Sequence, residues 1–197
     1  KYRAFNKTPL LSGSPATFND LLDTSVPVDY SGPRASHHFG SPQGGFFAGV
    51  VTPNKLHITC ILNPNTSPTL AAVDVTIPSW SPPAVLAPNL GGSGLDPLDG
   101  RTQNAVWRNG RMVTAHSIDD GTGTRNLASW YEIDTGNWPA SGSPILIQSG
   151  NIDAGPGIHT YQPAITVNTC DQLGVVLTRS SASEHVGIYV TGREATD

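Results

Sequence analysis

The sequence has few charged residues. Of its 197 residues, 11 are basic and 15 are acidic, which gives a formal net charge of −4 and a charged fraction of 13%. That fraction is about half of what an ordinary soluble domain carries. Because the Lys and Arg residues form no cluster, the chain lacks the electrostatic attraction that nucleic acids and anionic membranes require of a partner. We therefore expect neither as the main partner.

Long apolar runs and long uninterrupted segments are also missing. No apolar stretch approaches the roughly 20 residues that cross a bilayer, so no membrane span is expected. The 21 Gly and 17 Pro residues leave little room for long helices, because Gly weakens a helix and Pro breaks it. The apolar residues, 37% of the chain, include many Val, Ile, Leu, Trp and Tyr in short runs. The sequence therefore excludes a helical bundle, a coiled coil and a disordered tail.

Cysteine is scarce as well, with Cys60 and Cys170 as the two present. A single pair so far apart in sequence is compatible with one disulfide or with two free thiols. Cys60 lies in an apolar run where a free cysteine packs well as a small hydrophobic residue. The sequence leaves both alternatives open.

The start of the chain and its composition bear on its location. The sequence begins at Lys1 without Met or an apolar leader, so either a signal peptide has been removed or the sequence starts within a longer protein. Lys and Met are rare, whereas Ser, Thr, Asn and Gly are abundant. This composition resembles that of exported bacterial proteins, and we expect a secreted, extracellular or periplasmic location.

An internal repeat is the main positive signal in the sequence. Three segments show the same order of an apolar run, a tight polar turn, a second apolar run, a polar loop and a third, alternating run. The runs are Phe46 to Thr52, Leu56 to Leu62 and Leu70 to Ile77; Gln103 to Arg108, Met112 to Ser117 and Leu127 to Ile133; and Gln162 to Val167, Leu173 to Arg179 and Val186 to Gly192. Equivalent second and third runs recur every 56 to 61 residues, so two independent markers give one period.

Each run has the character of a β-strand. The runs are short, rich in Val, Ile, Thr, Tyr and Trp, and bounded by Gly, Pro, Asn or Asp. Asn109-Gly110 between two runs is a strong signal for a two-residue hairpin turn. A fourth short strand is expected at Ala84 to Ala87 and at Ile145 to Gln148. The repeat unit is therefore predicted to be a four-stranded antiparallel sheet.

Repeated sheets of this kind predict an all-β fold, a β-propeller, with a β-sandwich as the alternative. Residues 46–100 and 101–157 would form two blades, and 158–197 an incomplete one. Residues 1–45 would hold the end of a preceding blade, Tyr2 to Leu11, and a connector that includes Leu21 to Val28. A propeller needs about four blades to close. Three visible blades therefore indicate part of a larger propeller, or closure by further copies or by another protein.

The third segment resembles the blades of sialidase-like propellers and of related exported bacterial proteins. The likeness is carried by PAITV (163–167), LGVVLTRSS (173–181) and YVTGREATD (189–197), and at the level of blade pattern it covers Phe46 to Asp197. In that family the third strand of a blade runs into an Asp-box turn, S-x-D-x-G-x-T-W. Thr191 to Asp197 falls where such a turn would begin. Ser117 to Gly121 matches the Ser, Asp and Gly of the motif, but lacks its Thr and Trp and follows a second strand.

The resemblance implies a glycoside hydrolase as one possible function. Sialidases use an arginine triad, a Tyr nucleophile with a Glu partner, and an acidic Asp. The available residues are Arg101, Arg108, Arg111, Arg125, Arg179 and Arg193, with Tyr131, Tyr161 and Glu132, and no spacing ties three of them together. No catalytic residue is assigned, whether the protein is an enzyme stays open, and a non-catalytic role is favoured.

Five residues are candidates for ligand binding: Trp107, Arg108, Tyr131, Tyr161 and Arg193. Aromatic rings bind sugars by stacking, so a carbohydrate is a possible ligand. In a repeated sheet, however, most aromatic side chains are expected to pack between neighbouring sheets. Strand alternation places Trp130 and Glu132 on one face and Tyr131 on the other.

Metal binding has weak support. Asp119 and Asp120 precede Gly121 in an acidic turn that could hold a structural Ca²⁺, although an ordinary solvated loop is favoured. The six histidines, His37, His38, His57, His116, His159 and His185, show no metal-ligand spacing and are expected to be exposed or hydrogen-bonded. We expect no cofactor otherwise.

The function that these observations favour is a non-catalytic, exported β-propeller module that acts in binding or assembly, with a protein, further copies or a carbohydrate as partner. The alternatives are a fragment of a sialidase-like hydrolase and a structural subunit of an extracellular complex or filament.

Overall fold

The computed structural model describes residues 1–27 and 32–196; Val28, at the end of the expected connector, and Asp197 lie outside the described residues. The fold is all-β, as predicted, with 53% strand and 3% helix. The elements are β1 (Tyr2–Phe5), α1 (Lys7–Leu11), β2 (Phe18–Leu21), β3 (Arg34–Phe39), β4 (Gly45–Val51), β5 (Lys55–Leu62), β6 (Thr69–Thr76), β7 (Thr102–Arg108), β8 (Arg111–Asp119), β9 (Asn126–Asp134), β10 (Ile145–Ile152), β11 (Ile158–Val167), β12 (Leu173–Ser181) and β13 (Glu184–Arg193).

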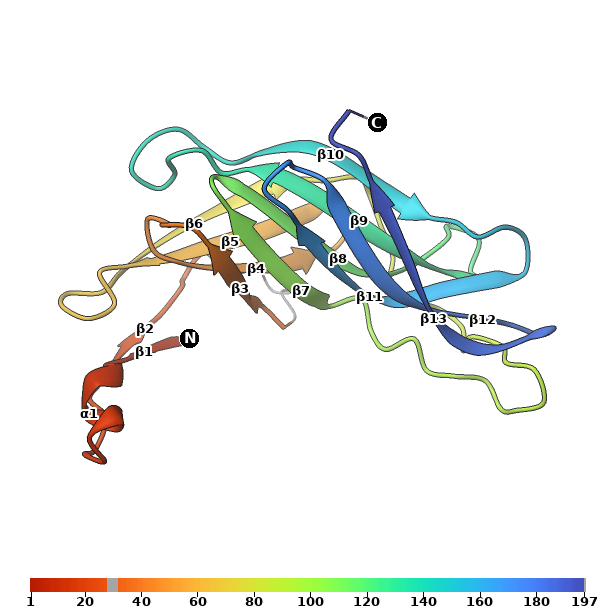
Figure 1. Ribbon diagram of the computed structural model, residues 1–197, viewed down its shortest axis with the longest axis horizontal. Helices are drawn as coiled ribbons and strands as arrows, with labels where there is room; N and C mark the ends of the chain where they lie inside the picture. The colour runs from red at the N-terminus through yellow and green to blue at the C-terminus, as the bar shows by residue number, and fades with distance from the viewer. Residues whose placement is uncertain (28–31, 197) are drawn as a thin grey trace.

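The largest sheet has eight strands in the order β10-β9-β8-β7-β3-β4-β5-β6. It curls into a half-barrel, so that its two edge strands, β6 and β10, approach each other (Figure 1). The hollow side of the curl is filled by apolar side chains from both halves, among them Phe46, Leu56, Ile58, Met112 and Ile133. Burial of this shared core is what holds the two halves of the sheet against each other.

The three-stranded sheet β11-β12-β13 packs on the outside of the curl. Strand β11 lies across β7, β8 and β9. A second apolar core fills this interface and includes Val113, Ala115, Ile165, Val175 and Leu177. Strands β7 to β9 are therefore covered on both faces, by the inside of the curl and by the third sheet.

All nine repeated runs form strands, as predicted. The Asn109-Gly110 turn joins β7 to β8, with φ values of 47° and 86°, and Arg108 pairs with Arg111 across it. Ile145 to Gln148 lies in β10, which confirms that fourth strand. The strand predicted at Ala84 to Ala87 is wrong, because that stretch makes a single isolated bridge between Ala87 and Leu95. Prolines at 82, 83 and 88 remove backbone donors there, and a strand needs those donors to pair.

Strand β3 changes the predicted arrangement of the sheets. It pairs antiparallel with β4 through Arg34 and Ala35, and parallel with β7 through Ser36 to Phe39. The first two repeat segments, expected as separate blades, are therefore joined into one sheet. The arrangement of the layers fits a β-sandwich as well as a β-propeller. The structure therefore establishes the all-β class, and the propeller is a proposal.

The first 45 residues contribute an arm and strand β3. Strands β1 and β2 pair with each other, and Figure 1 shows this hairpin with α1 projecting from the rest of the molecule. Of the stretch Tyr2 to Leu11, expected to end a preceding blade, Tyr2–Phe5 pairs with β2 and Lys7–Leu11 forms α1.

A buried polar network ties this arm to β5. The Tyr2 hydroxyl lies 3.0 Å from Thr59 Oγ1, which donates to Asp23 Oδ2 at 3.1 Å. His57 lies between two carboxylates, with Nε2 at 3.1 Å from Asp23 and Nδ1 at 2.7 Å from Asp74. His57, Thr59 and Asp23 are buried, so the arm supplies part of the hydrogen-bond partners that the outer side of β5 needs.

Replacing Asp23 should destabilise the fold. Asp23→Ala leaves Thr59 and His57 Nε2 without this acceptor in a buried site, and we expect the free energy of unfolding to fall by about 3 kcal/mol in urea denaturation. Burial raises the pKa of Asp23, but hydrogen bonds from Ser25 and His57 outweigh it and hold the pKa below the ordinary value. This stabilisation is therefore complete above pH about 4 and is lost as pH falls through the lowered pKa.

Asp20→Ala is the matched control, because Asp20 pairs with Arg3 and Lys1 on the exposed side of the hairpin. We expect a much smaller loss of stability for that variant. Equal losses for the two variants, or an acid dependence of stability that Asp23→Ala does not alter, would contradict the role of the buried network.

Candidate functional site

The outer face of the three-stranded sheet carries apolar side chains that the described part of the chain leaves exposed. Successive side chains of β12 and β13 alternate between the two faces. Leu173, Val175 and Leu177 point inward and are buried. The outward side chains Val176, Val186, Ile188 and Val190 are 39%, 48%, 80% and 80% exposed. We call these four side chains the outer apolar face.

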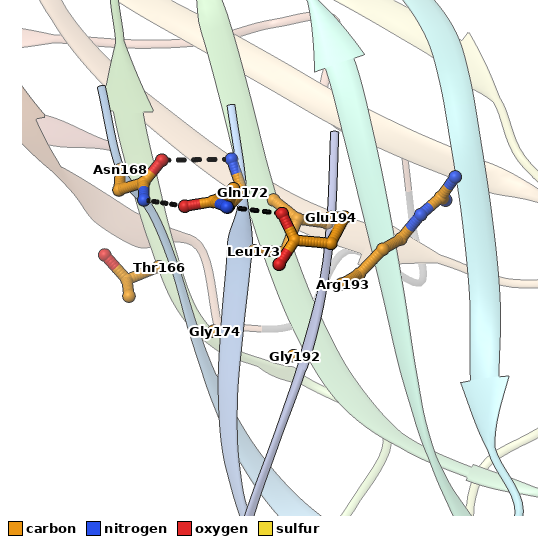
Figure 2. Close-up of a pocket in the computed structure, with 8 residues that line it drawn as sticks. All are labelled: Thr166, Asn168, Gln172, Leu173, Gly174, Gly192, Arg193 and Glu194. Atoms are coloured by element: carbon orange, nitrogen blue, oxygen red, sulfur yellow. Dashed lines mark hydrogen bonds between the residues drawn. The ribbon is translucent and has the colours of Figure 1, made fainter. Parts of the chain in front are cut away.

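A hollow of about 420 Å³ lies at one end of this face. Gly174 on β12 pairs with Gly192 on β13, so no side chain fills the space beside Thr166 (Figure 2). A Cβ added to Gly192 would lie 2.8 Å from the Leu173 carbonyl oxygen, which is too close. A Cβ added to Gly174 would make an ordinary contact of 3.6 Å with Thr166. Gly192 is thus required by the backbone, whereas Gly174 only keeps the hollow open.

A chain of polar side chains closes the end of the hollow. Asn168 donates from Nδ2 to Gln172 Oε1 at 2.6 Å and accepts from the Gln172 backbone N–H at 3.0 Å. Gln172 Nε2 in turn donates to Glu194, and Figure 2 shows the three side chains in a row from β11 to β13. Their mutual hydrogen bonds fix their orientation, so amide and carboxylate groups lie at one end of the outer apolar face.

Arg193 is the one predicted ligand residue that lines this hollow. In Figure 2 its side chain points away from the Asn168–Gln172–Glu194 chain, and its guanidinium lies 5.6 Å from the ring centre of Trp130. A second hollow of about 240 Å³, lined by Arg193, Trp130 and Ile152, lies between the sheets at the same end. Arg193 therefore separates an open outer hollow from an aromatic inner one.

The predicted aromatic ligand residues lie in the core, which is the alternative that the sequence left open. Trp107, Tyr131 and Tyr161 are at most 5% exposed. Trp107 stacks on Phe46 and donates to Thr135, and the Tyr161 hydroxyl lies 3.1 Å from Ser180 Oγ. Tyr131 also lines a small cavity beside Trp80.

Arg108, also predicted as a ligand residue, makes contacts within the fold. Its Nε donates to the Val167 carbonyl at 2.9 Å, and its guanidinium stacks on Phe39 at 4.4 Å. This contact ties β7 to β11, so the five predicted ligand residues do not form one site.

The remaining arginines of the sialidase-like set are held by acidic side chains. Arg101 pairs with Asp99, Arg125 with Asp120 and Asp153, and Arg179 with Glu184. Arg111 donates to the buried Glu132, whose other oxygen accepts from Gln148. Trp130 and Glu132 share one face of β9 and Tyr131 lies on the other, as predicted. This pairing leaves the carboxylate-binding arginine triad without support.

The acidic turn is a hairpin loop between β8 and β9. Asp119 accepts from the backbone N–H groups of Gly121 and Gly123, at 2.7 and 3.1 Å. Hydrogen bonds from Thr122, opposed by burial and helped by Arg125, lower the pKa of Asp120 to about 2. Within residues 1–27 and 32–196, no three His, Cys, Asp or Glu side chains gather as a metal site, and Ca²⁺ at this loop stays a prediction.

Both cysteines are free thiols in the structure. Cys60 is buried on the inside of the curl, and burial raises the pKa of its thiol to about 12. Cys170 is exposed in the turn between β11 and β12. Of the two alternatives that the sequence left open, the structure has the unbonded one.

The residues that sequence reasoning missed are those of the outer apolar face and its polar rim. The alternation of Val186, Ile188 and Val190 was visible as a strand pattern, but a strand pattern does not tell which face is covered. Gln172 and Glu194 meet through folding across 22 positions of sequence, and no local motif marks them.

Comparison of the chain with protein-family models, with curated proteins and with solved structures gives no significant match. Among the described residues, no helix is long and apolar enough to cross a membrane.

The two cysteines should differ sharply in reactivity. In the native protein, iodoacetamide should alkylate Cys170 and leave Cys60 unmodified, because the reactive thiolate of Cys60 is suppressed by burial. After unfolding in denaturant, both thiols should react. The mass of the intact chain and of its peptides measures this, and Cys170→Ser should abolish native labelling. A native chain that resists labelling until a reductant is added would contradict the free thiols and restore the disulfide.

Proposed function

We propose that this protein is a non-catalytic β-sheet module that acts in assembly, and that its outer apolar face packs against the same face of a second copy. The observation that carries the proposal is the exposure of Ile188 and Val190, each at 80%, on a regular, well-paired sheet. A contiguous apolar face on a folded domain marks an interaction surface, because leaving it in water is unfavourable.

A second sheet is the partner that best fits this face. The inner apolar faces of the curl pack on each other, and the inner face of β11-β12-β13 packs on the outside of the curl. The outer apolar face has the same alternating pattern as these buried faces but no sheet over it. A copy of the chain supplies a sheet of matching chemistry, and a two-fold axis lets one surface serve both partners.

The shape of the face is suited to self-association. Val186 and Ile188 project at one end, and the Gly174–Gly192 hollow lies at the other. A two-fold axis across the face would set the projecting side chains of each copy over the hollow of the other. The edge of β13 is less available, because Leu90 donates to the Glu184 carbonyl and the Val186 N–H donates to Asn89. The face, and not the edge, is therefore the surface proposed.

The propeller, the exported location and the sialidase-like hydrolase are further proposals from the sequence. Under the propeller interpretation, the same outer face would pack against a further blade, which also makes assembly its role. The composition supports an exported location, which fits an assembly module. A sialidase-like hydrolase has less support, because Arg101, Arg111, Arg125 and Arg179 are each paired with acidic groups.

The oligomeric state tests the proposal directly. We expect the wild-type chain to form a dimer at micromolar concentration in native mass spectrometry and light scattering. Ile188→Lys places a charge on a side chain that would enter the hollow of the second copy, and it should weaken association by about 30-fold or more, as the loss of a well-packed interface residue does. Gly174→Ala should weaken association less, since it fills the hollow by one methyl group.

Ile145→Lys is the matched control, because Ile145 is 59% exposed on β10, an edge strand of the other sheet. It should leave the dimer unchanged, and all three variants should unfold at the wild-type temperature when measured as monomers. A monomeric wild type, or a dimer that survives Ile188→Lys, would overturn the proposal.

A further inference from the structure

The interface between the two sheets opens at one end, beside the edge strand β13. Thr191 of β13 pairs with Val175 of β12, and cross-strand partners point to the same face of a sheet. Arg193 pairs with Leu173 in the same way. Val175 and Leu173 are buried, whereas Thr191 is exposed although it points inward. The second hollow, of about 240 Å³, lies in front of Thr191, and we call it the inner hollow.

The inner hollow has mainly apolar walls. Trp130 of β9 and Ile152 of β10 line it together with Leu173 and Val175. Trp130 and Ile152 are half-buried and pack only partly against the second core, so part of each side chain is accessible from the hollow. An apolar cavity of about 150 Å³ holds a molecule of the size of benzene. The inner hollow therefore has room for one six-membered ring or a short alkyl chain.

Arg193 brings an unused positive charge to this space. Among the described residues, its guanidinium has no hydrogen-bond acceptor and no acidic partner, and of its three nitrogens only Nε is buried. The two terminal nitrogens are therefore the ones that a ligand can reach. Every other arginine of the chain donates to a carboxylate or to a backbone carbonyl: Arg3, Arg34, Arg101, Arg108, Arg111, Arg125 and Arg179.

The Arg193 guanidinium is turned toward the inner hollow. Figure 2 shows it pointing away from Glu194, the adjacent acidic residue, which accepts from Gln172 on the outer side. Its central carbon lies 5.6 Å from the centre of the Trp130 ring. A guanidinium beside an aromatic ring keeps its N–H groups in its own plane, where they can bind a carboxylate. Arg193 therefore offers charged donors at the edge of an apolar space.

We propose that the inner hollow binds a small monocarboxylic acid with an apolar body of about one ring. Its carboxylate pairs with the terminal nitrogens of Arg193, and its apolar body packs against Trp130 and Ile152. A phosphate monoester is a poorer ligand, because it carries nearly two negative charges and a single arginine would leave one uncompensated beside apolar walls.

This inference is independent of the proposed assembly function. The inner hollow lies on the inner face of β13, whereas Val186, Ile188 and Val190 project from its outer face. Binding of the acid therefore requires no second copy of the chain.

The test follows the Trp130 indole N–H signal by NMR in ¹⁵N-labelled protein, with the signal assigned by its loss in Trp130→Phe. The probes are benzoate, phenylacetate and hexanoate, each titrated to millimolar concentration at constant ionic strength. We expect at least one acid to shift this signal saturably. The neutral amide of the same acid should bind at least tenfold more weakly, because it lacks the charge that pairs with Arg193.

Three variants make the test specific. Arg193→Gln removes the charge and should weaken binding of the acid about 30-fold, the effect of a lost hydrogen bond between charged groups, while binding of the amide stays unchanged. Arg101→Gln is the matched control, because it removes the same charge from an exposed arginine that does not line the hollow, and it should bind the acid as the wild type does. Thr191→Leu fills the hollow from an exposed position and should abolish binding of acid and amide alike, which tests the site even if Arg193→Gln does not fold.

The proposal is overturned if no acid shifts the Trp130 signal saturably, or if the amide binds as tightly as the acid. Wild-type affinity in Arg193→Gln or in Thr191→Leu would overturn it as well. The outcome is separable from that of the assembly proposal, since Ile188→Lys should bind the acid with unchanged affinity whether or not the wild type forms a dimer. Loss of acid binding in Ile188→Lys would contradict the placement of the ligand in the inner hollow.

Discussion

Strand β8 is buried along nearly its whole length, from Met112 to Asp119, because one of its faces lines the curl and the other meets the third sheet. A strand that is covered on both sides has no solvent to satisfy its polar side chains, so each of them needs a partner inside the protein. Thr114 donates to the Asn104 carbonyl, and Ser117 accepts from the Gln162 N–H. These hydrogen bonds help to determine where the neighbouring segments lie.

The third sheet is held in place by the same rule. It shares no strand pairing with the curled sheet, so its register over β7 to β9 depends on apolar packing and on side chains that bond to backbone. The Asn104 amide does so most completely: it donates to the Ile165 carbonyl at 2.8 Å and accepts from the Ile165 N–H at 3.0 Å. One amide side chain thereby imitates a strand neighbour and fixes where β11 crosses β7.

The local sequence pattern was enough to predict the strands but not which strands pair with each other. Alternation and the Asn109-Gly110 turn placed nine strands, since both signals are contained within a few residues. The strand predicted at Ala84 to Ala87 does not form, because the prolines around this apolar stretch remove backbone donors that strand pairing needs. Pairing of β3 with β7 joins residues nearly seventy positions apart, and nothing local in Ser36 to Phe39 encodes that choice. The same applies to the site: the apolar alternation in β13 was visible, whereas the Gly174–Gly192 hollow depends on the register between two strands.

The position of β3 also determines when the curled sheet can be completed while the chain is being synthesised. Residues 34–39 leave the ribosome well before residues 102–108, yet the parallel half of their pairing requires β7. Until β7 has been made, Ser36 to Phe39 have no strand beside them on that side, and β4 to β6 form a sheet with an unfilled edge. The curl therefore closes late, and a ribosome that stalls before residue 102 would present an open edge able to pair with other nascent chains.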